Sequence, residues 1–227
     1  MIQTFINEDT EAVKFLTEIF TLNKSKNISE NKTTFSTSEC TQCPRRLIYK
    51  SLCYIEDIDD SSYSSWYDVK QNHVKNIWKN KFLGINKIEL KDSSVDVYDA
   101  RLNLSGTVDF VINIPDVDVK SFPVMVYAVE NCMETVSRRN VIETMINAWL
   151  MDYKNAILIY QDHDQHKIYQ ISVYKPIIDS IEKKFSDLVK YKIRGAIPKR
   201  PVKTQEESQE CGTCNYKKRC WENIKNG

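Results

Sequence analysis

The residues with the clearest chemistry are cysteines near the two ends of the chain. Cys211, Cys214 and Cys220 follow one another, separated by two and then five residues, in a basic segment. Three thiolates at this spacing can hold a zinc ion or part of an iron–sulfur cluster, and either needs a fourth ligand. Cys43 is the candidate for that ligand, and Cys40, in the same CTQC segment, is the alternative.

A second group of candidate ligands is acidic. Asp109 lies in the strand-like run SGTVDFVI, Glu130 closes the next run, VYAVENC, and His73 lies on a predicted helix. Two carboxylates and an imidazole can bind a divalent ion, and oxygen ligands suit Mg²⁺ or Mn²⁺ and phosphate chemistry. Each residue also has a structural interpretation. Asp109 could be an edge or turn residue, and His73 could be a buried core histidine.

Positive charge is concentrated toward the C-terminus. Residues 183 to 203 include eight lysines and arginines, and Lys217, Lys218 and Arg219 lie inside the last cysteine group. Such a surface can hold phosphates, although a charge run can equally be a solvated face. The net charge of +1 gives no global electrostatic argument for nucleic acid.

Length and composition favour an ordinary globular protein. The 227 residues are 41% hydrophobic and 28% charged, which suits one domain with a full core. No window holds the roughly 18 apolar residues of a membrane span. The acidic start, MIQTFINEDTEAVKF, argues against a signal or transit peptide, and seven cysteines argue against a closed disulfide set. We therefore expect a cytoplasmic protein in a reducing compartment, within the host cell if the chain is viral, and no membrane association.

The periodicity of apolar residues predicts a mixed α/β (α+β) fold. Helical spacing covers residues 9–22, 45–55, 65–82, 137–154 and 177–194, and Pro44 suits the first turn of the second helix. The buried face of the third helix is expected to hold Trp66, Val69, His73, Ile77 and Trp78. Strand-like runs cover residues 86–91, 95–102, 106–114, 123–131, 155–162 and 167–175, with a turn at Lys91-Asp92-Ser93-Ser94. This order predicts a mixed sheet with helices packed against it.

The domain organisation follows from these elements. We expect an N-terminal helix and polar loop over residues 1–35, a core over residues 36–208, and a cysteine segment over residues 209–227. A metal cluster would draw that last segment back onto residues 40–46 and so join the two ends of the chain.

One combination of motifs resembles a known family. Cys43-Pro44-Arg45-Arg46, then His73, the GTVD sequence ending at Asp109, then Glu130 and the closing cysteines are similar to the RecB-like PD-(D/E)XK nucleases with an iron–sulfur cluster. Within that group the pattern looks like the CRISPR-associated exonucleases and their viral counterparts. The resemblance covers residues 36 to 222 and implies a restriction-endonuclease-like central sheet flanked by helices.

The resemblance also implies cofactors and a substrate. It implies a [4Fe–4S] cluster on Cys43, Cys211, Cys214 and Cys220, and Mg²⁺ or Mn²⁺ held by His73, Asp109 and Glu130. It implies exonuclease action on DNA that is single-stranded or has free ends. We expect the basic side chains near the cluster to contact the nucleic acid: Arg45, Arg46, Lys217, Lys218 and Arg219.

The chain departs from the family where a nuclease needs a cation. The family has a lysine two residues after the strand acid, and Cys132 stands there; a thiol supplies no positive charge. On the following helix Glu143 and Asn147 replace a glutamine and a tyrosine. The sequence leaves two main hypotheses: a metal-dependent exonuclease, or an impaired nuclease fold kept as a DNA-binding or protein-interaction subunit. A zinc-stapled interaction module without a nucleic-acid role is the third.

Overall fold

The computed structural model describes residues 34–54, 64–115, 121–130, 136–162, 165–201 and 209–222. The helix expected over residues 9–22 lies outside these ranges. So does Cys132, which stands where the resembled family has a lysine.

A six-stranded mixed sheet forms the centre of the fold. Its strands are β1 (Phe35–Ser36), β2 (Glu89–Asp99), β3 (Leu104–Asn113), β4 (Ser121–Ala128), β5 (Asn155–Gln161) and β6 (His166–Ser172). They run in the order β1-β3-β4-β5-β6, with β2 also paired to β3. The β1–β3 and β4–β5 pairs are parallel and the others antiparallel. The predicted fold class, a mixed sheet flanked by helices, is confirmed.

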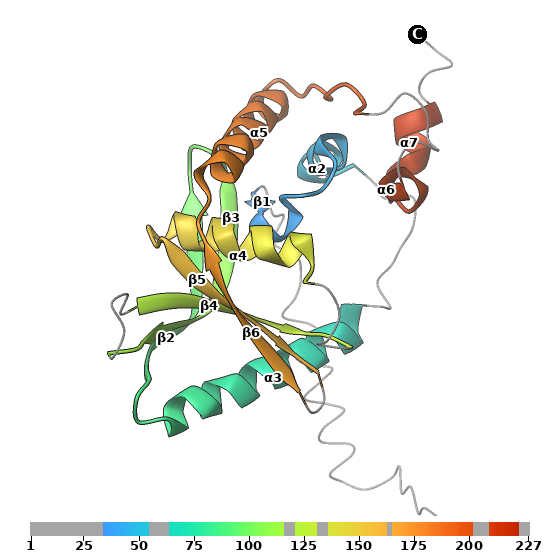
Figure 1. Ribbon diagram of the computed structural model, residues 1–227. Helices are drawn as coiled ribbons and strands as arrows, with labels where there is room; N and C mark the ends of the chain where they lie inside the picture. Colours follow the sequence, from blue (N-terminus) through green and yellow to red (C-terminus); the bar gives the residue numbers. More distant parts are fainter. Residues whose placement is uncertain are drawn as a thin grey trace, which may run out of the picture. The chain divides into compact units, whose positions relative to one another are not determined.

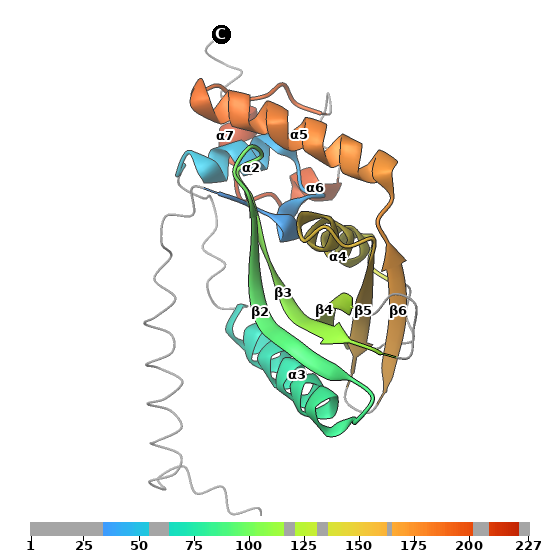
Figure 2. The same cartoon turned by 90° about the vertical axis from the view of Figure 1, so that its left-hand side faces the viewer.

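Helices cover both faces of this sheet. The helices of the described ranges are η1 (Thr37–Glu39), α2 (Pro44–Ser51), α3 (Ser64–Gly84), α4 (Arg138–Leu150), α5 (Lys175–Ile193), α6 (Gln209–Gly212) and α7 (Lys217–Glu222). Figures 1 and 2 show α3 on one face and α4 on the other, with α2 and α5 stacked beyond α4. Strand β4 and the second half of β3, Val108–Ile112, are almost continuously buried because both of their faces are covered. Within the described ranges, no helix has the length and apolarity to cross a bilayer.

Two local features were predicted well. Pro44 does occupy the first turn of α2, where its missing N–H would have no helical partner in any case. The edge strand β6 alternates exposed and half-buried residues, as its period-two sequence indicates.

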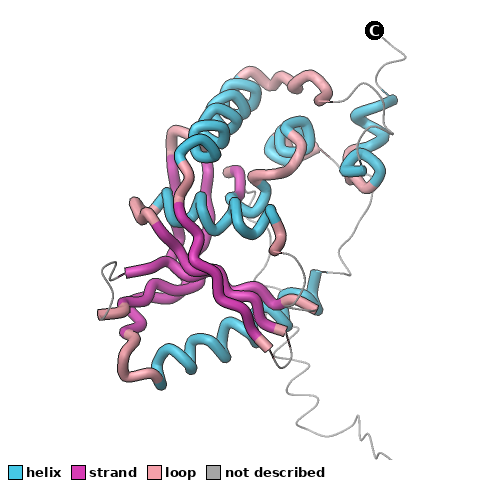
Figure 3. The backbone as a smooth tube through the Cα atoms, viewed as in Figure 1, coloured by secondary structure: helices cyan, strands magenta, loops and turns pink. Residues whose placement is uncertain are grey.

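Strand β2 differs from the prediction. The predicted turn at residues 91–94 is wrong, because these polar residues continue one long strand. The register with β3 shifts between Leu90 and Asp92, and Ser94 has φ of 57°, so the strand absorbs the irregularity without reversing. Its exposed outer face explains why polar side chains are tolerated. Figure 2 shows β2 as one long strand, and Figure 3 shows the strands of the sheet between helices.

The buried face of α3 also differs from the prediction. Val69 is 45% exposed and His73 is exposed, whereas Val74, Trp78 and Phe82 are buried. The helix is therefore rotated relative to the predicted face, because the aromatic pair Trp78 and Phe82 packs under the sheet against residues such as Phe110. This rotation decides which polar side chains of α3 reach the strands.

Candidate functional site

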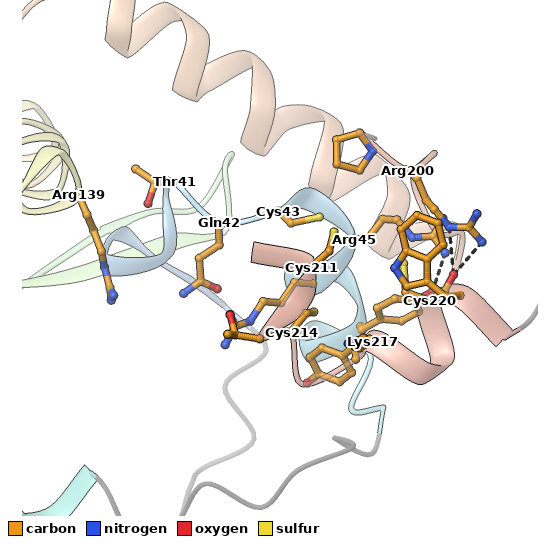
Figure 4. A pocket seen from close by; sticks show the side chains of 16 residues that line it. Thr41, Gln42, Cys43, Arg45, Arg139, Arg200, Cys211, Cys214, Lys217 and Cys220 are labelled. Atoms are coloured by element: carbon orange, nitrogen blue, oxygen red, sulfur yellow. Dashed lines mark hydrogen bonds between the residues drawn. The ribbon is translucent and has the colours of Figure 1, made fainter. Parts of the chain in front are cut away.

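Four cysteines line one cavity of about 260 Å³ beside α2. They are Cys43, Cys211, Cys214 and Cys220, drawn around the cavity in Figure 4. Cys43 is the residue that precedes α2, while Cys211 lies in α6 and Cys220 in α7. Cys40 is not among the lining residues; it is 1% exposed and belongs to the hydrophobic cluster behind the cavity. The fold therefore brings Cys43 to the C-terminal trio.

Aromatic and arginine contacts hold the C-terminal segment on α2. Tyr216 is 2% exposed, and its ring centroid lies 5.5 Å from that of Tyr49. Arg219 lies over Tyr54, with its guanidinium carbon 4.5 Å from the ring centroid. Arg200 donates from Nε and Nη2 to the Cys220 carbonyl, at 3.0 and 2.7 Å. These contacts place the trio opposite Cys43 through the protein's own packing.

The cavity is strongly cationic. Its lining includes five basic side chains: Arg45, Arg46, Arg139, Arg200 and Lys217. Burial raises the pKa of the Cys214 thiol, Arg46 lowers it, and the neighbouring Cys43 and Cys220 raise it again. Thiolates so close to one another repel, and a bound metal centre together with surrounding cations would offset that charge.

The donor set fits an iron–sulfur cluster. Thiolates are soft ligands that select zinc or iron–sulfur centres. No group of three or more His, Cys, Asp or Glu side chains in the described ranges is arranged to hold a single metal ion. In a [4Fe–4S] cluster each thiolate binds a different iron, so the sulfurs surround a wider space than zinc ligands do. Four cysteines around one cavity are a donor set for either kind of centre.

Some of the basic residues already have internal partners. Arg45 donates from Nη1 to the Pro198 carbonyl at 2.8 Å and from Nη2 to the Tyr49 hydroxyl at 2.7 Å. Arg45 therefore ties α2 to the segment after α5. Arg46 and Lys217 line the cavity itself, and Lys218 is exposed on α7.

The acidic candidates lie elsewhere, where β3 and β4 separate. In the described residues, the β3–β4 ladder runs from Asn113–Ser121 to Phe110–Val124. Beyond that pair, Asp109 Oδ2 accepts a hydrogen bond of 2.7 Å from the Val126 N–H. Side chains thus replace the strand pairing at this fork.

Helix α3 supplies the other contacts of the fork. The Gln71 side chain accepts from the Ala128 N–H at 2.7 Å and donates to the Val126 carbonyl. Lys70 Nζ donates to the Val129 carbonyl at 2.9 Å. The backbone of β4 therefore bonds to α3 where its partner strand has moved away.

An ion pair between a buried carboxylate and a Lys75 side chain that is 34% exposed occupies the centre of the fork. Asp109 is 5% exposed, and Lys75 Nζ lies 2.6 Å from its Oδ1 atom. Burial raises the pKa of the Asp109 carboxyl, and Lys75 and the Val126 N–H oppose this rise. Burial also raises the pKa of Glu143 on α4, and burial followed by the Glu143 carboxylate raises the pKa of Tyr127. Asp109, Glu143 and Tyr127 therefore form one electrostatic group with Lys75.

The other predicted acid-site residues are not gathered there. His73 is exposed, since two residues along a helix turn the side chain by about 200° from that of Lys75. Glu130 is exposed and follows β4, which ends at Ala128. The structure does not assemble His73, Asp109 and Glu130 into a metal-binding group among the described residues.

Sequence reasoning missed Met125, Tyr127, Gln71 and Lys75. The β3–β4 ladder ends at the Phe110–Val124 pair, just before Asp109, and the Met125 sulfur on the opposite strand accepts a hydrogen bond from Asn147 Nδ2 at 3.5 Å. The sequence contained a signal for Gln71 and Lys75. They are four residues apart and lie on either side of Val74, so they share the inner side of the helix with it.

The Asp109 centre does not fit Mg²⁺ or Mn²⁺. Lys75 and the Val126 N–H engage both carboxylate oxygens of Asp109. An ion approaching this carboxylate would also meet the like charge of the Lys75 ammonium.

Comparisons with known proteins support the fold. No protein-family model and no curated protein matches the sequence. Among solved structures, the protein SSO0001 aligns with a TM-score of 0.57 and 16% identity, over 95% of this chain and 98% of its own. The alkaline exonuclease LHK-Exo from Laribacter hongkongensis aligns with a TM-score of 0.52 and 8% identity, over 75% of this chain and 93% of its own. LHK-Exo in complex with dAMP aligns with a TM-score of 0.55 and 9% identity, over the same shares of the two chains, 75% and 93%. At these identities the likeness shows a shared fold, that of known exonucleases.

Proposed function

We propose that this chain is a DNA-processing protein of the iron–sulfur RecB-like nuclease type, which binds DNA with little or no cleavage. The observation that carries the proposal is the meeting of four cysteines and five basic side chains at one cavity of an exonuclease-like fold. The impaired centre follows from Asp109, whose partners are the Lys75 ammonium and the Val126 N–H.

In this proposal Cys43, Cys211, Cys214 and Cys220 hold a [4Fe–4S] cluster. The cluster would cross-link the start of α2 to the C-terminal cysteine segment. The free energy of binding the cluster would then add to the stability of the folded protein. Tyr216 and Arg200 position the C-terminal thiols from the protein side. The two segments joined by the cluster would present Arg46, Lys217 and Lys218 to the phosphates of a single strand or a DNA end.

DNA binding tests the proposal directly. We expect the cluster-loaded protein to bind a labelled single-stranded oligonucleotide with an affinity that falls steeply with salt, because bound phosphates release counterions. Replacing Arg46 or Lys218 by Ala should reduce the slope of log affinity against log salt by about 0.7 per lost contact. Lys175→Ala, an exposed lysine at the start of α5, is the matched control and should leave the slope unchanged. DNA binding that is absent, or that does not depend on salt, would contradict the proposal. It would favour a protein-interaction module held together by zinc or by the cluster.

A second candidate is a metal-dependent exonuclease. It is favoured by the carboxylates of Asp109 and Glu143 and the ammonium of Lys75, which share one electrostatic group. The assay is degradation of single-stranded DNA in Mn²⁺ or Mg²⁺. Degradation by the wild-type protein that Asp109→Asn abolishes would establish this candidate over the impaired one.

A further inference from the structure

We infer that the Lys75 ammonium is the resident cation of the fork between β3 and β4, and that it closes the Asp109 centre to divalent metal ions. The interpretation of this fork as a former nuclease centre rests on the proposed function. The ion pair itself is a property of the described residues alone.

The first argument is the pairing of Asp109 with a cation. Its Oδ1 lies 2.6 Å from Lys75 Nζ, and its Oδ2 accepts the Val126 N–H at 2.7 Å. Each oxygen keeps a further lone pair, so a metal ion could reach Asp109 only beside these two partners. An incoming cation would also meet the like charge of Lys75.

The second argument is the chemistry of the neighbours. Met125 and Tyr127 alternate onto the same face of β4 and belong to the same buried cluster. The Tyr127 hydroxyl is buried beside Glu143, and burial and Glu143 both raise its pKa, which keeps the phenol neutral. A neutral phenol is a poor ligand for Mg²⁺ or Mn²⁺.

The third argument is that the ammonium is held in place. Val74 and Trp78, on either side of Lys75 in the helix, are 4% and 5% exposed. Gln71, one turn earlier, is bonded to the β4 backbone. The stem of Lys75 is thus carried by an anchored stretch of α3. Its partner carboxylate is 4% exposed, the lowest value among the ion pairs between described residues.

Removing the ammonium should therefore create a metal site. In Lys75→Ala, Asp109 and Glu143 would be two carboxylates with no neighbouring ammonium, and the lost side chain would leave room for a hydrated ion. Two carboxylates with retained waters are a ligand set that Mn²⁺ and Mg²⁺ accept.

The test is Mn²⁺ binding by the full-length, cluster-loaded protein, followed by electron paramagnetic resonance and by the shift in thermal unfolding. We expect wild-type and Lys79→Ala, an exposed lysine on the same helix, to show no binding that depends on Asp109. Lys75→Ala should bind Mn²⁺ at least tenfold more tightly, and adding Asp109→Asn should abolish the gain. Lys75→Met, which keeps an apolar stem, is the second variant should the alanine protein fold poorly.

The outcomes separate the two proposals. Asp109-dependent Mn²⁺ binding by wild-type protein, or folded Lys75 variants without a gain, would overturn the assignment. A gain of Mn²⁺ binding in a protein that binds no DNA would support Lys75 as the resident cation and contradict the DNA-binding proposal.

Discussion

The ring of Tyr216 packs against that of Tyr49, with centroids 5.5 Å apart and planes inclined at 33°. This contact joins the C-terminal cysteine segment to α2, the helix that Cys43 precedes. Because the contact is made by side chains, the segment has a docking surface that does not depend on cluster ligation.

Tyr216→Ala should loosen this docking. Tyr216 is 2% exposed, and removing a buried aromatic ring costs about 3–5 kcal/mol of unfolding free energy. We expect a lower urea midpoint and less iron per chain after purification. Tyr174→Ala, at a residue that is 59% exposed, should change neither measurement. Normal iron content in Tyr216→Ala would mean that the thiols alone position the segment.

The ligand set can be separated by single cysteine replacements. Cys43→Ala should lose most of the iron and sulfide, because Cys43 lines the cavity with the C-terminal trio. Cys40→Ala should keep them, since Cys40 lies in the hydrophobic cluster, and exposed Cys53→Ala serves as a control. Iron and sulfide analysis with visible absorption decides between the two. Loss of the cluster in Cys40→Ala but not in Cys43→Ala would reverse the assignment.

The sequence predicted the cysteine convergence better than the acidic centre, and the reason is physical. Thiol spacing is a local property, and three cysteines within ten residues restrict their chemistry wherever they fold. The position of Lys75 depends instead on how α3 is rotated, which the packing of Trp78 and Phe82 decides. Glu130 is predicted at the strand end, but β4 stops at Ala128 and its pairing with β3 ends at Val124. Tertiary packing of this kind leaves no periodicity in the sequence.

Gln71→Ala should weaken the fork. The Gln71 side chain bonds to both the N–H of Ala128 and the carbonyl of Val126, on a segment of β4 that is buried. Leaving buried backbone groups unsatisfied costs about 1–3 kcal/mol. Asn72→Ala, at an exposed position next in the helix, should cost under about 0.5 kcal/mol. Urea unfolding measures both, and amide hydrogen exchange at Ala128 should rise only in Gln71→Ala.

Gly106→Ala should be strongly destabilising. A Cβ atom there would overlap Asn147 Oδ1 on α4 and Thr37 Oγ1 in η1, and these two residues are 0% and 1% exposed. Overpacking of this kind costs about 1–3 kcal/mol. Gly84→Ala is the control, because nothing lies within 4 Å of its added methyl. Equal urea midpoints for the two variants would show that η1 and α4 shift to make room for the added methyl group.

The Cys40 thiol should make stability fall at high pH. Burial, followed by Glu143, raises its pKa from 9.0 to about 11, while Lys184 and Arg139 oppose the shift. Above pH 9 the unfolded chain releases this proton and the folded chain keeps it, so unfolding becomes more favourable until pH 11. A pKa difference of about two between the folded and unfolded chain corresponds to a loss of roughly 3 kcal/mol in unfolding free energy. Urea unfolding in reductant at pH 8 to 11 should show a shallower loss for Cys40→Ala than for wild type, whereas exposed Cys53→Ala should follow wild type. Parallel curves for Cys40→Ala and wild type would mean that the Cys40 site accommodates a thiolate.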